Sequence, residues 1–374
     1  MRTRSFLISM FLLVLLGSLG FAAALRFTRS FQWFDAIALA LATISVSVVA
    51  LGAWRRFRAN RDPAAKAPWW SMRPNVAGLC AIFLLAPWWV FRVPASMGEG
   101  PAGPAVDARR FDRPWRNGRV RFVSLGDSVS TGFGAGQGLG YFELIIRNRD
   151  DVYPEVRGAE LSRVFPNFTV MRLATNSSNS IEHERVVESI APAAKDEFGI
   201  ICITTGGIDL IHPYGRGTPR EGAMFGADFA TAKPWIERFE ARLGRMMEML
   251  LEKFPGGCAV FIATIYDPTD GEEDIENAGP IFWLSPWPEG MAIFNGFNDA
   301  IKRTAEKYDH VYLVDVHRVM LGHGIHCRDR DNAHYHPDDP TYWYYVNLED
   351  PNQRGYDAIR RAFLNAIADA LEPR

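Results

Sequence analysis

A serine lies in the turn that follows a short apolar run near the middle of the chain. Residues 120–134 read VRFVSLGDSVSTGFG, in which Ser128 follows Gly126 and Asp127. The apolar run has the length and β-branched content of a buried strand and ends in turn-forming residues. Because ligands bind at the carboxyl ends of strands in open parallel sheets, we expect the Ser128 hydroxyl at such an edge. Gly, Asp and Ser are also common turn residues, so this stretch alone fits a tight loop as well.

A serine hydroxyl is a weak nucleophile until a base takes its proton, and histidine is best matched to that task near neutral pH. Most of the chain's eight histidines follow the last predicted strand, at positions 317, 323, 326, 334 and 336. We take His326 and His334 as candidate bases, because both precede the aromatic run TYWYY, which can cover a site. His212 is a further candidate. The alternatives are a metal site or a solvated surface, and since the spacings match no standard ligand set, we expect no metal.

The elements that must position these residues alternate along the chain. Apolar runs predict strands over residues 120–125, 169–174, 199–205, 258–265 and 310–316. Apolar residues at three and four residue spacing predict helices over 181–194, 235–254, 294–308 and 355–371. Such alternation predicts a three-layer α/β/α domain with a parallel five-stranded sheet, over residues 118–374.

Four blocks in this domain resemble, in order, those of the SGNH or GDSL hydrolases. They read GDSVSTGFG, LATNSSNS, TTGGIDL and NLEDPNQRGY. The resemblance implies an SGNH, flavodoxin-like fold, a serine nucleophile at Ser128 and no cofactor. It places Ser177 at the position of the family's second-block glycine, and Gly207 beside Ile208, which stands where the family has an oxyanion asparagine. Asp127 and Asp209 flank these positions and join the expected substrate-binding set, although Asp209 also fits a helix cap.

The fourth block departs from the family's pattern at its two catalytic positions. Asn347 stands where the resemblance implies an aspartate, and Asp350 stands where it implies the histidine base, while Pro351, Asn352, Gly355 and Tyr356 match. We therefore expect a triad in which Asp350 orients a histidine taken from the long preceding loop, His326 or His334. Asp350 alternatively fits a cap of the last helix.

The function that this pattern favours is a serine esterase acting on an O-acyl ester of an envelope carbohydrate or a lipid. The amides of Ser128 and Gly207 are expected to stabilise the oxyanion. Acyl transfer differs from hydrolysis only in the acceptor, so an O-acyltransferase stays open. The loss of the family's asparagine and histidine also leaves open a non-catalytic domain that binds a glycan or lipid through aromatic residues: Trp283, Trp287, Tyr342, Trp343 and Tyr344.

Three apolar stretches precede this domain, over residues 5–25, 36–54 and 76–91. The first two are long enough to cross a bilayer of roughly 30 Å, and the third is shorter and contains Pro87. A cleaved signal peptide is the alternative for the first stretch. The loop 55–73 carries six basic residues and one acid, which predicts a cytoplasmic loop and, with three spans, a domain outside the cytoplasm. We expect a membrane region over 1–95, a linker over 96–117 and a multi-pass protein of the cytoplasmic membrane.

Charge and cysteine content exclude other classes. The formal net charge of −2 lacks the basic field that binding to a nucleic acid needs. Three of the four cysteines, Cys80, Cys202 and Cys258, lie in apolar runs and only Cys327 lies in a loop, which indicates buried thiols rather than a disulfide framework.

Overall fold

The computed structural model describes residues 100–211, 213–215, 222, 224–278, 284–345 and 347–373, all within the unit Met97–Arg374. The three predicted membrane spans, His212 and Trp283 lie outside the described residues. Within the described ranges, no helix combines the length and the apolar character that a bilayer crossing requires.

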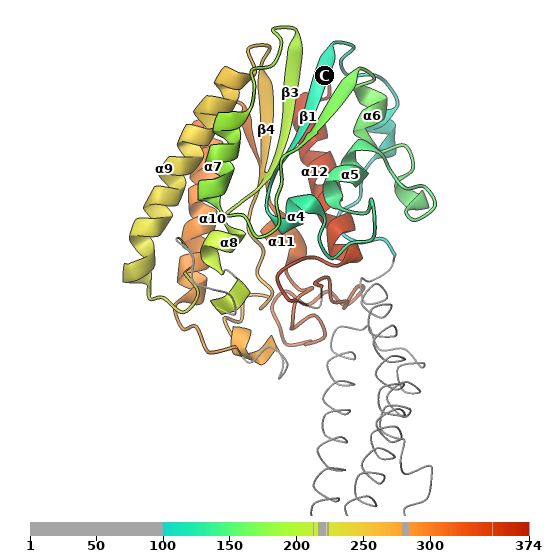
Figure 1. Ribbon diagram of the computed structural model, residues 1–374. Coiled ribbons are helices and arrows are strands. Elements are labelled where there is room, and N and C mark those ends of the chain that lie inside the picture. Colours follow the sequence, from blue (N-terminus) through green and yellow to red (C-terminus); the bar gives the residue numbers. More distant parts are fainter. Residues whose placement is uncertain are drawn as a thin grey trace, which may run out of the picture. The chain divides into compact units, whose positions relative to one another are not determined.

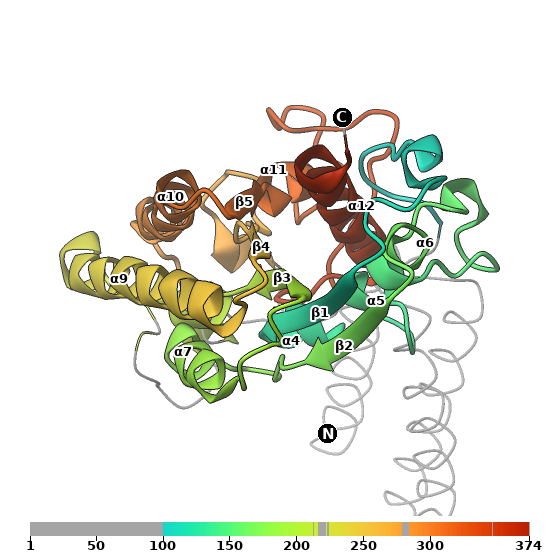
Figure 2. The ribbon, with the colours of Figure 1, turned by 90° about the horizontal axis from the view of Figure 1, so that it is seen from above.

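Five parallel strands form one sheet in the order β2-β1-β3-β4-β5 (Figures 1 and 2). The strands are β1 (Arg119–Gly126), β2 (Phe168–Arg172), β3 (Glu197–Thr204), β4 (Cys258–Ala263) and β5 (Val311–Val314). This arrangement confirms the predicted five-stranded parallel sheet. Strands β1, β3 and β4 are almost wholly buried, as expected for strands covered on both faces.

Helices cover both faces of the sheet. Helices α7 (Ser180–Ser189), α9 (Phe229–Lys253) and α10 (Gly290–Lys307) lie on one face, and α5 (Tyr141–Ile146) and α12 (Gln353–Leu371) on the other (Figure 2). Short helices lie among the connecting loops: α4 (Ser128–Thr131), α6 (Leu161–Val164), α8 (Gly207–Leu210), α11 (Val316–Met320), η2 (Ala108–Phe111), η3 (Pro154–Val156), η4 (Pro213–Gly215) and η5 (Ile275–Ala278).

Element ends differ from the predicted ends where a cap or a proline intervenes. Strand β5 stops at Val314 because the Asp315 side chain accepts from the Arg318 amide and begins α11. Helix α7 ends at Ser189, short of the predicted 194, since Pro192 disfavours helical backbone just before it. Helix α9 begins earlier than predicted because Asp228 caps it through the Thr231 amide at 2.7 Å.

The described part of the predicted linker, residues 100–117, packs on the domain. Phe111 is fully buried, and the Ala102 amide donates to Asp357 Oδ2 of α12 at 2.9 Å. Asp357 is itself buried and paired with Arg360 and Arg361. This stretch therefore contributes to the core, although its sequence is rich in Gly and Pro.

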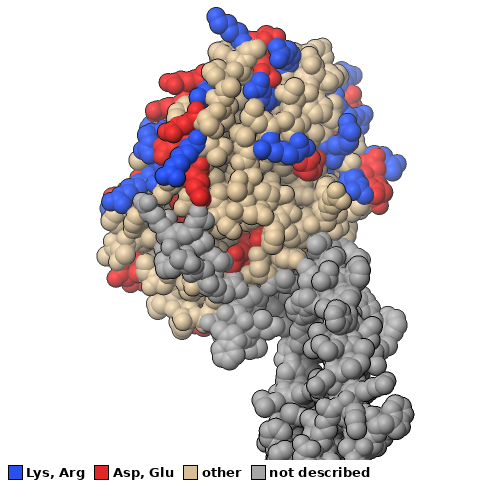
Figure 3. All heavy atoms as spheres, viewed as in Figure 1, with Lys and Arg blue, Asp and Glu red and all other residues tan. Residues whose placement is uncertain are grey.

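Charges of both signs are intermixed on the surface in view in Figure 3, and no large patch of one sign is seen on that face. Ion pairs of the domain include Arg303 with Glu240 and Arg172 with Glu143, all partly exposed. Such pairs contribute little to stability.

Candidate functional site

The turn after β1 presents Ser128 at the carboxyl edge of the sheet. Gly126 has a φ of +143°, and a Cβ at this position would lie 2.2 Å from the Thr204 carbonyl oxygen, so only glycine fits. The Asp127 carboxylate then accepts from the Val129 amide at 3.1 Å and begins α4, of which Ser128 is the first residue. The sequence therefore forms a sharp strand-to-helix turn with the serine at its tip.

Buried hydroxyl groups fix this turn. Ser130 Oγ lies 2.9 Å from both Tyr141 Oη and Thr204 Oγ1. Tyr356, the last matching residue of the fourth block, donates from its hydroxyl to the Phe133 carbonyl at 2.7 Å and approaches the Ser128 carbonyl at 3.4 Å. The backbone that carries the Ser128 side chain is thus held from β3, α5 and α12.

Asp350 lies beside Ser128. Its side chain is buried, and Asn347 Nδ2 donates to its Oδ2 at 2.6 Å. Burial raises the pKa of Asp350, whereas contacts with the Ser128 hydroxyl and Asn347 lower it. Asp350 Oδ1 is buried and accepts no well-formed hydrogen bond from the described residues. A carboxylate oxygen that lacks a donor, close to a serine hydroxyl, is able to accept the serine proton.

Asp127 is a second buried carboxyl group at this site. Burial raises its pKa to about 7, the hydrogen bond from Thr204 Oγ1 at 2.9 Å opposes the rise, and the charge of Asp350 adds to it. Because like charges in a buried site disfavour each other, the charge of Asp350 makes ionisation of Asp127 less favourable. Asp127 also holds α4, so its first role is to shape the turn.

The third block forms the neighbouring wall. Gly206 has a φ of +94° and begins α8, and a Cβ there would lie 2.9 Å from the Phe239 ring. Gly207 and Ile208 line the same cavity as Ser128. Asp209 points elsewhere: its carboxylate accepts from the Ser180 amide at 2.9 Å and lies 4.0 Å from Arg242 Nη1. Asp209 thus fastens α8 to α7 and α9.

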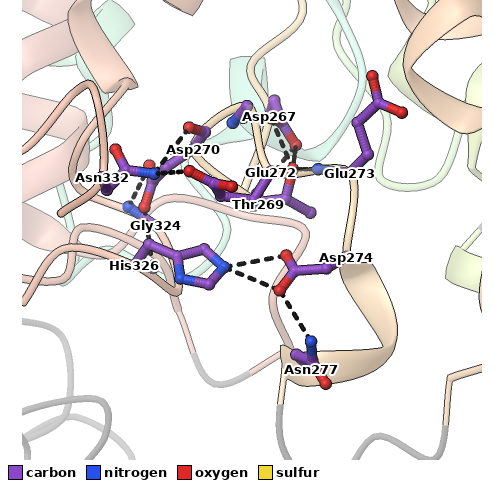
Figure 4. Close-up of polar contacts among 11 residues, drawn as sticks. Asp267, Thr269, Asp270, Glu272, Glu273, Asp274, Asn277, Gly324, His326 and Asn332 are labelled. Carbon is purple, nitrogen blue, oxygen red and sulfur yellow. Dashed lines mark hydrogen bonds and ion pairs between the residues drawn. The ribbon is translucent and has the colours of Figure 1, made fainter. Parts of the chain in front are cut away.

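The predicted histidines and Ser177 lie away from this cavity or outside the described residues. His326 Nε2 bonds to Asp274 at 2.9 Å, and Figure 4 shows its ring directed at that carboxylate. The His334 ring lies near Gly271, and neither histidine is among the described residues that line the cavity. Ser177 has a φ of +59°, is exposed and lines a separate pocket. A histidine base therefore stays a prediction, as does the role of His212.

His183, which the sequence did not indicate, contacts residues next to the Ser128 turn and the third block. It is buried on α7, with Nε2 2.7 Å from Ser178 Oγ and Nδ1 2.8 Å from Thr205 Oγ1. Burial lowers its pKa to about 3, so the ring is neutral. Ser178 in turn donates to the Gly126 carbonyl at 3.1 Å. Thr204 was also missed, and the only signal for it is its position at the end of β3, opposite Gly126.

The cavity beside Ser128 has a volume of about 100 Å³. Its described lining comes from the turn after β1, from α8, from the loop after β4 and from α10, and includes Asp127, Ser128, Gly207, Ile208, Leu210, Ile265, Tyr266, Trp287, Met291 and Phe294. No group of three or more His, Cys, Asp or Glu side chains in the described part of the chain is arranged to hold a metal ion.

The sequence model of the GDSL-like Lipase/Acylhydrolase family matches residues 124–344. The matched region includes the Ser128 turn and the third block, and it ends before Asp350. No match was found among curated proteins.

Several solved structures are similar to this chain. An α/β hydrolase enzyme from the metagenome of Lake Arreo, Spain, is 18% identical with a TM-score of 0.40, over 69% of this chain and 99% of that chain. A catalytic mutant of an acetylxylan esterase from Geobacillus stearothermophilus is 15% identical, with a TM-score of 0.41 and coverages of 67% and 94%. A member of the lipolytic protein G-D-S-L family from Veillonella parvula DSM 2008 is 13% identical, with a TM-score of 0.40 and coverages of 66% and 96%. Likenesses at this level assign neither a substrate nor site residues.

Proposed function

Because the chain belongs to the GDSL-like lipase/acylhydrolase family and is an esterase of that type, acting on ester bonds, we propose that Ser128 is its nucleophile and that Asp350 takes the serine proton. The observation that supports this assignment is the buried Asp350 carboxylate next to the Ser128 hydroxyl, whose Oδ1 accepts no well-formed hydrogen bond from the residues that the structure describes. The family's histidine position is thus filled by a carboxylate whose pKa burial moves toward neutrality. A base is most effective when its pKa lies near the working pH.

The reaction proceeds in two balanced halves. Ser128 Oγ attacks the ester carbonyl carbon while its proton passes to Asp350, and the resulting tetrahedral intermediate collapses as the carbon–oxygen bond to the alcohol breaks. The alcohol oxygen takes the proton from Asp350, which leaves an acyl-serine. Water then attacks this acyl group, giving its proton to Asp350, and the carboxylic acid leaves as Ser128 Oγ regains the proton. A sugar hydroxyl in place of water would make the second half an acyl transfer.

The negative charge that develops on the carbonyl oxygen needs fixed donors. The amides of Ser128 and Gly207 are suited to this role, because both residues line the cavity at the first positions of α4 and α8. Ile208 brings no donor from its side chain where the family has an asparagine, so the backbone carries more of the stabilisation. One such donor contributes about 3–4 kcal/mol in enzymes of this kind.

The substrate that fits this proposal is an O-acyl ester of an envelope carbohydrate or a lipid, and the domain is tethered to the cytoplasmic membrane and faces outward. The tether rests on the apolar stretches 5–25, 36–54 and 76–91 and on the basic loop 55–73. A reporter that is active only after export, fused after residue 105, is expected to be active. A silent reporter, with an active cytoplasmic reporter at the same position, would refute the outward orientation.

The nucleophile is tested by Ser128→Ala. Labelling by a fluorophosphonate probe should be lost, and kcat/KM for an activated ester should fall by several orders of magnitude, because in the proposed mechanism the acyl intermediate forms on Ser128 Oγ. Ser189→Ala, which changes an exposed serine on α7, serves as the matched control and should keep both signals. Unchanged turnover in Ser128→Ala would refute the mechanism.

A further inference from the structure

We propose that the cavity beside Ser128 holds the acyl part of the ester and selects a flexible apolar acyl chain longer than acetyl. This inference rests on the proposed function, since it assumes that Ser128 attacks the ester carbonyl. It adds the class of acyl group and the residues that select it. Three properties of the cavity support it: the apolar character of its walls, the pairing of its polar groups and its size.

The walls of the cavity are mainly apolar. Ile208 and Leu210 of α8 and Phe294 of α10 are buried and line the cavity. Val316 of α11 and Ile359 of α12 add two further buried apolar side chains. A sugar ring, which carries a hydroxyl group on most of its carbons, would lose hydrogen bonds to water against such walls, whereas a hydrocarbon chain would lose none.

The four threonines of the wall, together with Asp127, Asp267 and Tyr266, are already hydrogen-bonded within the protein. The pairs are Thr204 with Asp127, Thr205 with His183, Thr264 with Asp315, Thr269 with Asp267, and Tyr266 with the Glu349 carbonyl. A polar ligand in the cavity would have to break these bonds or remain unpaired, and both are unfavourable. An apolar chain leaves every pair intact.

The size of the cavity exceeds what an acetyl group needs. A water-sized group requires about 10–15 Å³ of such space, so a cavity of about 100 Å³ has room for roughly six to ten of them. An acetyl group has a single methyl beyond the carbonyl and would leave most of this space empty. Unfilled apolar space gives up the binding free energy that further methylene groups would provide.

The exposed side of the cavity suits the alcohol part of the ester. Glu273 lines the cavity and is exposed. Figure 4 shows its side chain pointing away from the hydrogen bonds that are drawn among its neighbours in residues 267–274. With the acyl chain between α8 and α10, the alcohol oxygen faces Ser128, Asp350 and solvent. A large polar alcohol is therefore compatible with a deep apolar acyl site.

The test uses p-nitrophenyl acetate, butyrate, hexanoate and octanoate with the full chain. We expect kcat/KM to rise by about fourfold for each methylene that enters the cavity, and then to level off when the cavity is full. Met291→Trp, which enlarges a half-buried side chain of the wall, should lower the ratio of octanoate to acetate kcat/KM at least tenfold. Leu251→Trp, at an exposed position of α9, is the matched control and should keep the wild-type ratio.

Each outcome bears on a different statement. A wild-type enzyme that prefers acetate while Ser128 is still labelled would overturn this inference and leave the proposed function intact. A normal chain-length profile in folded Met291→Trp would overturn the placement of the acyl chain. If Met291→Trp does not fold, the second measurement is the labelling rate of the wild-type protein with alkyl phosphonates of increasing chain length. Faster labelling with longer chains would support the inference, and equal or slower labelling would overturn it. Absence of both labelling and turnover would overturn the proposed function together with this inference.

Discussion

Asp350 illustrates how burial changes what a side chain does. An exposed carboxyl group has a pKa near 4 and is a poor base for a serine. Burial raises the pKa of Asp350, and contacts with the Ser128 hydroxyl and with Asn347 Nδ2, which donates at 2.6 Å, oppose this rise. The substitution of the family's histidine by Asp350 is therefore accompanied by an environment that makes the carboxylate more basic.

The role of Asp350 as a base predicts a large loss in Asp350→Asn. The amide has nearly the same shape but does not accept the serine proton, so kcat/KM for an activated ester should fall by about 10²–10⁴-fold. The measurement is steady-state kinetics at several pH values. Asp369→Asn, which changes an exposed carboxylate on α12, should have wild-type kinetics. A loss of less than tenfold in Asp350→Asn would point to another base, such as His212.

The pH dependence gives a second prediction, through Asn347→Asp. A base must be deprotonated, so activity should rise with pH through the pKa of Asp350, which burial places above its usual value. The variant replaces a donor that lowers this pKa with a nearby negative charge that raises it. The rising limb of the kcat/KM profile should therefore move to higher pH. An unmoved limb would show that Asp350 is not the titrating group.

Loops, rather than helices and strands, position Asp350 and the candidate bases His326 and His334. The loop after α11 is attached to the loop after β4 through Asp270, whose carboxylate accepts from the amides of Gly322, Gly324 and His326 at 2.8–3.0 Å (Figure 4). His326 is further held by Asp274. These bonds direct His326 to the neighbouring loop.

Asp270→Asn should destabilise the protein in a pH-dependent way. Asparagine keeps one oxygen and places an NH₂ group where the other was. Either the His326 amide, which donates to Oδ2, or the Gly322 and Gly324 amides, which donate to Oδ1, therefore lose their acceptor, at a cost of about 1–3 kcal/mol of unfolding free energy for each amide left unpaired. Burial raises the pKa of Asp270 to about 7, above its unfolded value, so the stability it contributes is present at low pH and lost as pH rises through about 7. The difference from wild type should be largest near pH 4 and shrink toward pH 8 in urea titrations. Asp329→Asn, in an exposed part of the same loop, is the control. A difference in unfolding free energy between Asp270→Asn and wild type that does not change with pH would contradict a raised pKa for Asp270.

Sequence patterns predicted the regular elements well and the contacts between loops poorly. Runs such as 120–125 and 199–205 are recognisable because strands buried on both faces need continuous apolar residues. The first, third and fourth blocks also selected Ser128, Gly207 and Asp350 as site residues, and in the structure Ser128 and Gly207 line one cavity while Asp350 contacts Ser128. The bond between Thr204 and Asp127 depends on the register of β3 with β1, which no local pattern records. For the same reason, the partner of His326 could not be foreseen.

The domain as a whole extends further toward the amino terminus than its strand pattern indicates. Phe111 is fully buried, with its ring 5.2 Å from that of Trp115, and Arg110 bonds to Glu372 near the end of α12. The segment around η2 thus covers the side of the domain formed by α12. A boundary drawn at residue 118 would expose this surface.

Phe111→Ala should therefore lower the free energy of unfolding by about 3–5 kcal/mol, because a large buried side chain leaves a cavity that the surroundings fill only in part. Chemical denaturation of the two proteins measures the difference. Phe229→Ala, at the exposed start of α9, is the matched control and should change stability much less. Equal losses in the two variants would indicate that η2 does not belong to the folded core.

The position of β1 between β2 and β3 also has a consequence for the time course of folding. The turn at Gly126 packs closely against the Thr204 backbone of β3. The two strands that pair with β1, β2 and β3, are each separated from it in sequence by a crossover connection. Pairings between distant segments form slowly, because the chain loses entropy before the contacts repay it. We therefore expect the nucleophile turn to form late in folding. During refolding from denaturant, reaction of Ser128 with a covalent probe should lag behind the recovery of helical circular dichroism. The rate of this reaction would then report when the turn that carries the serine forms.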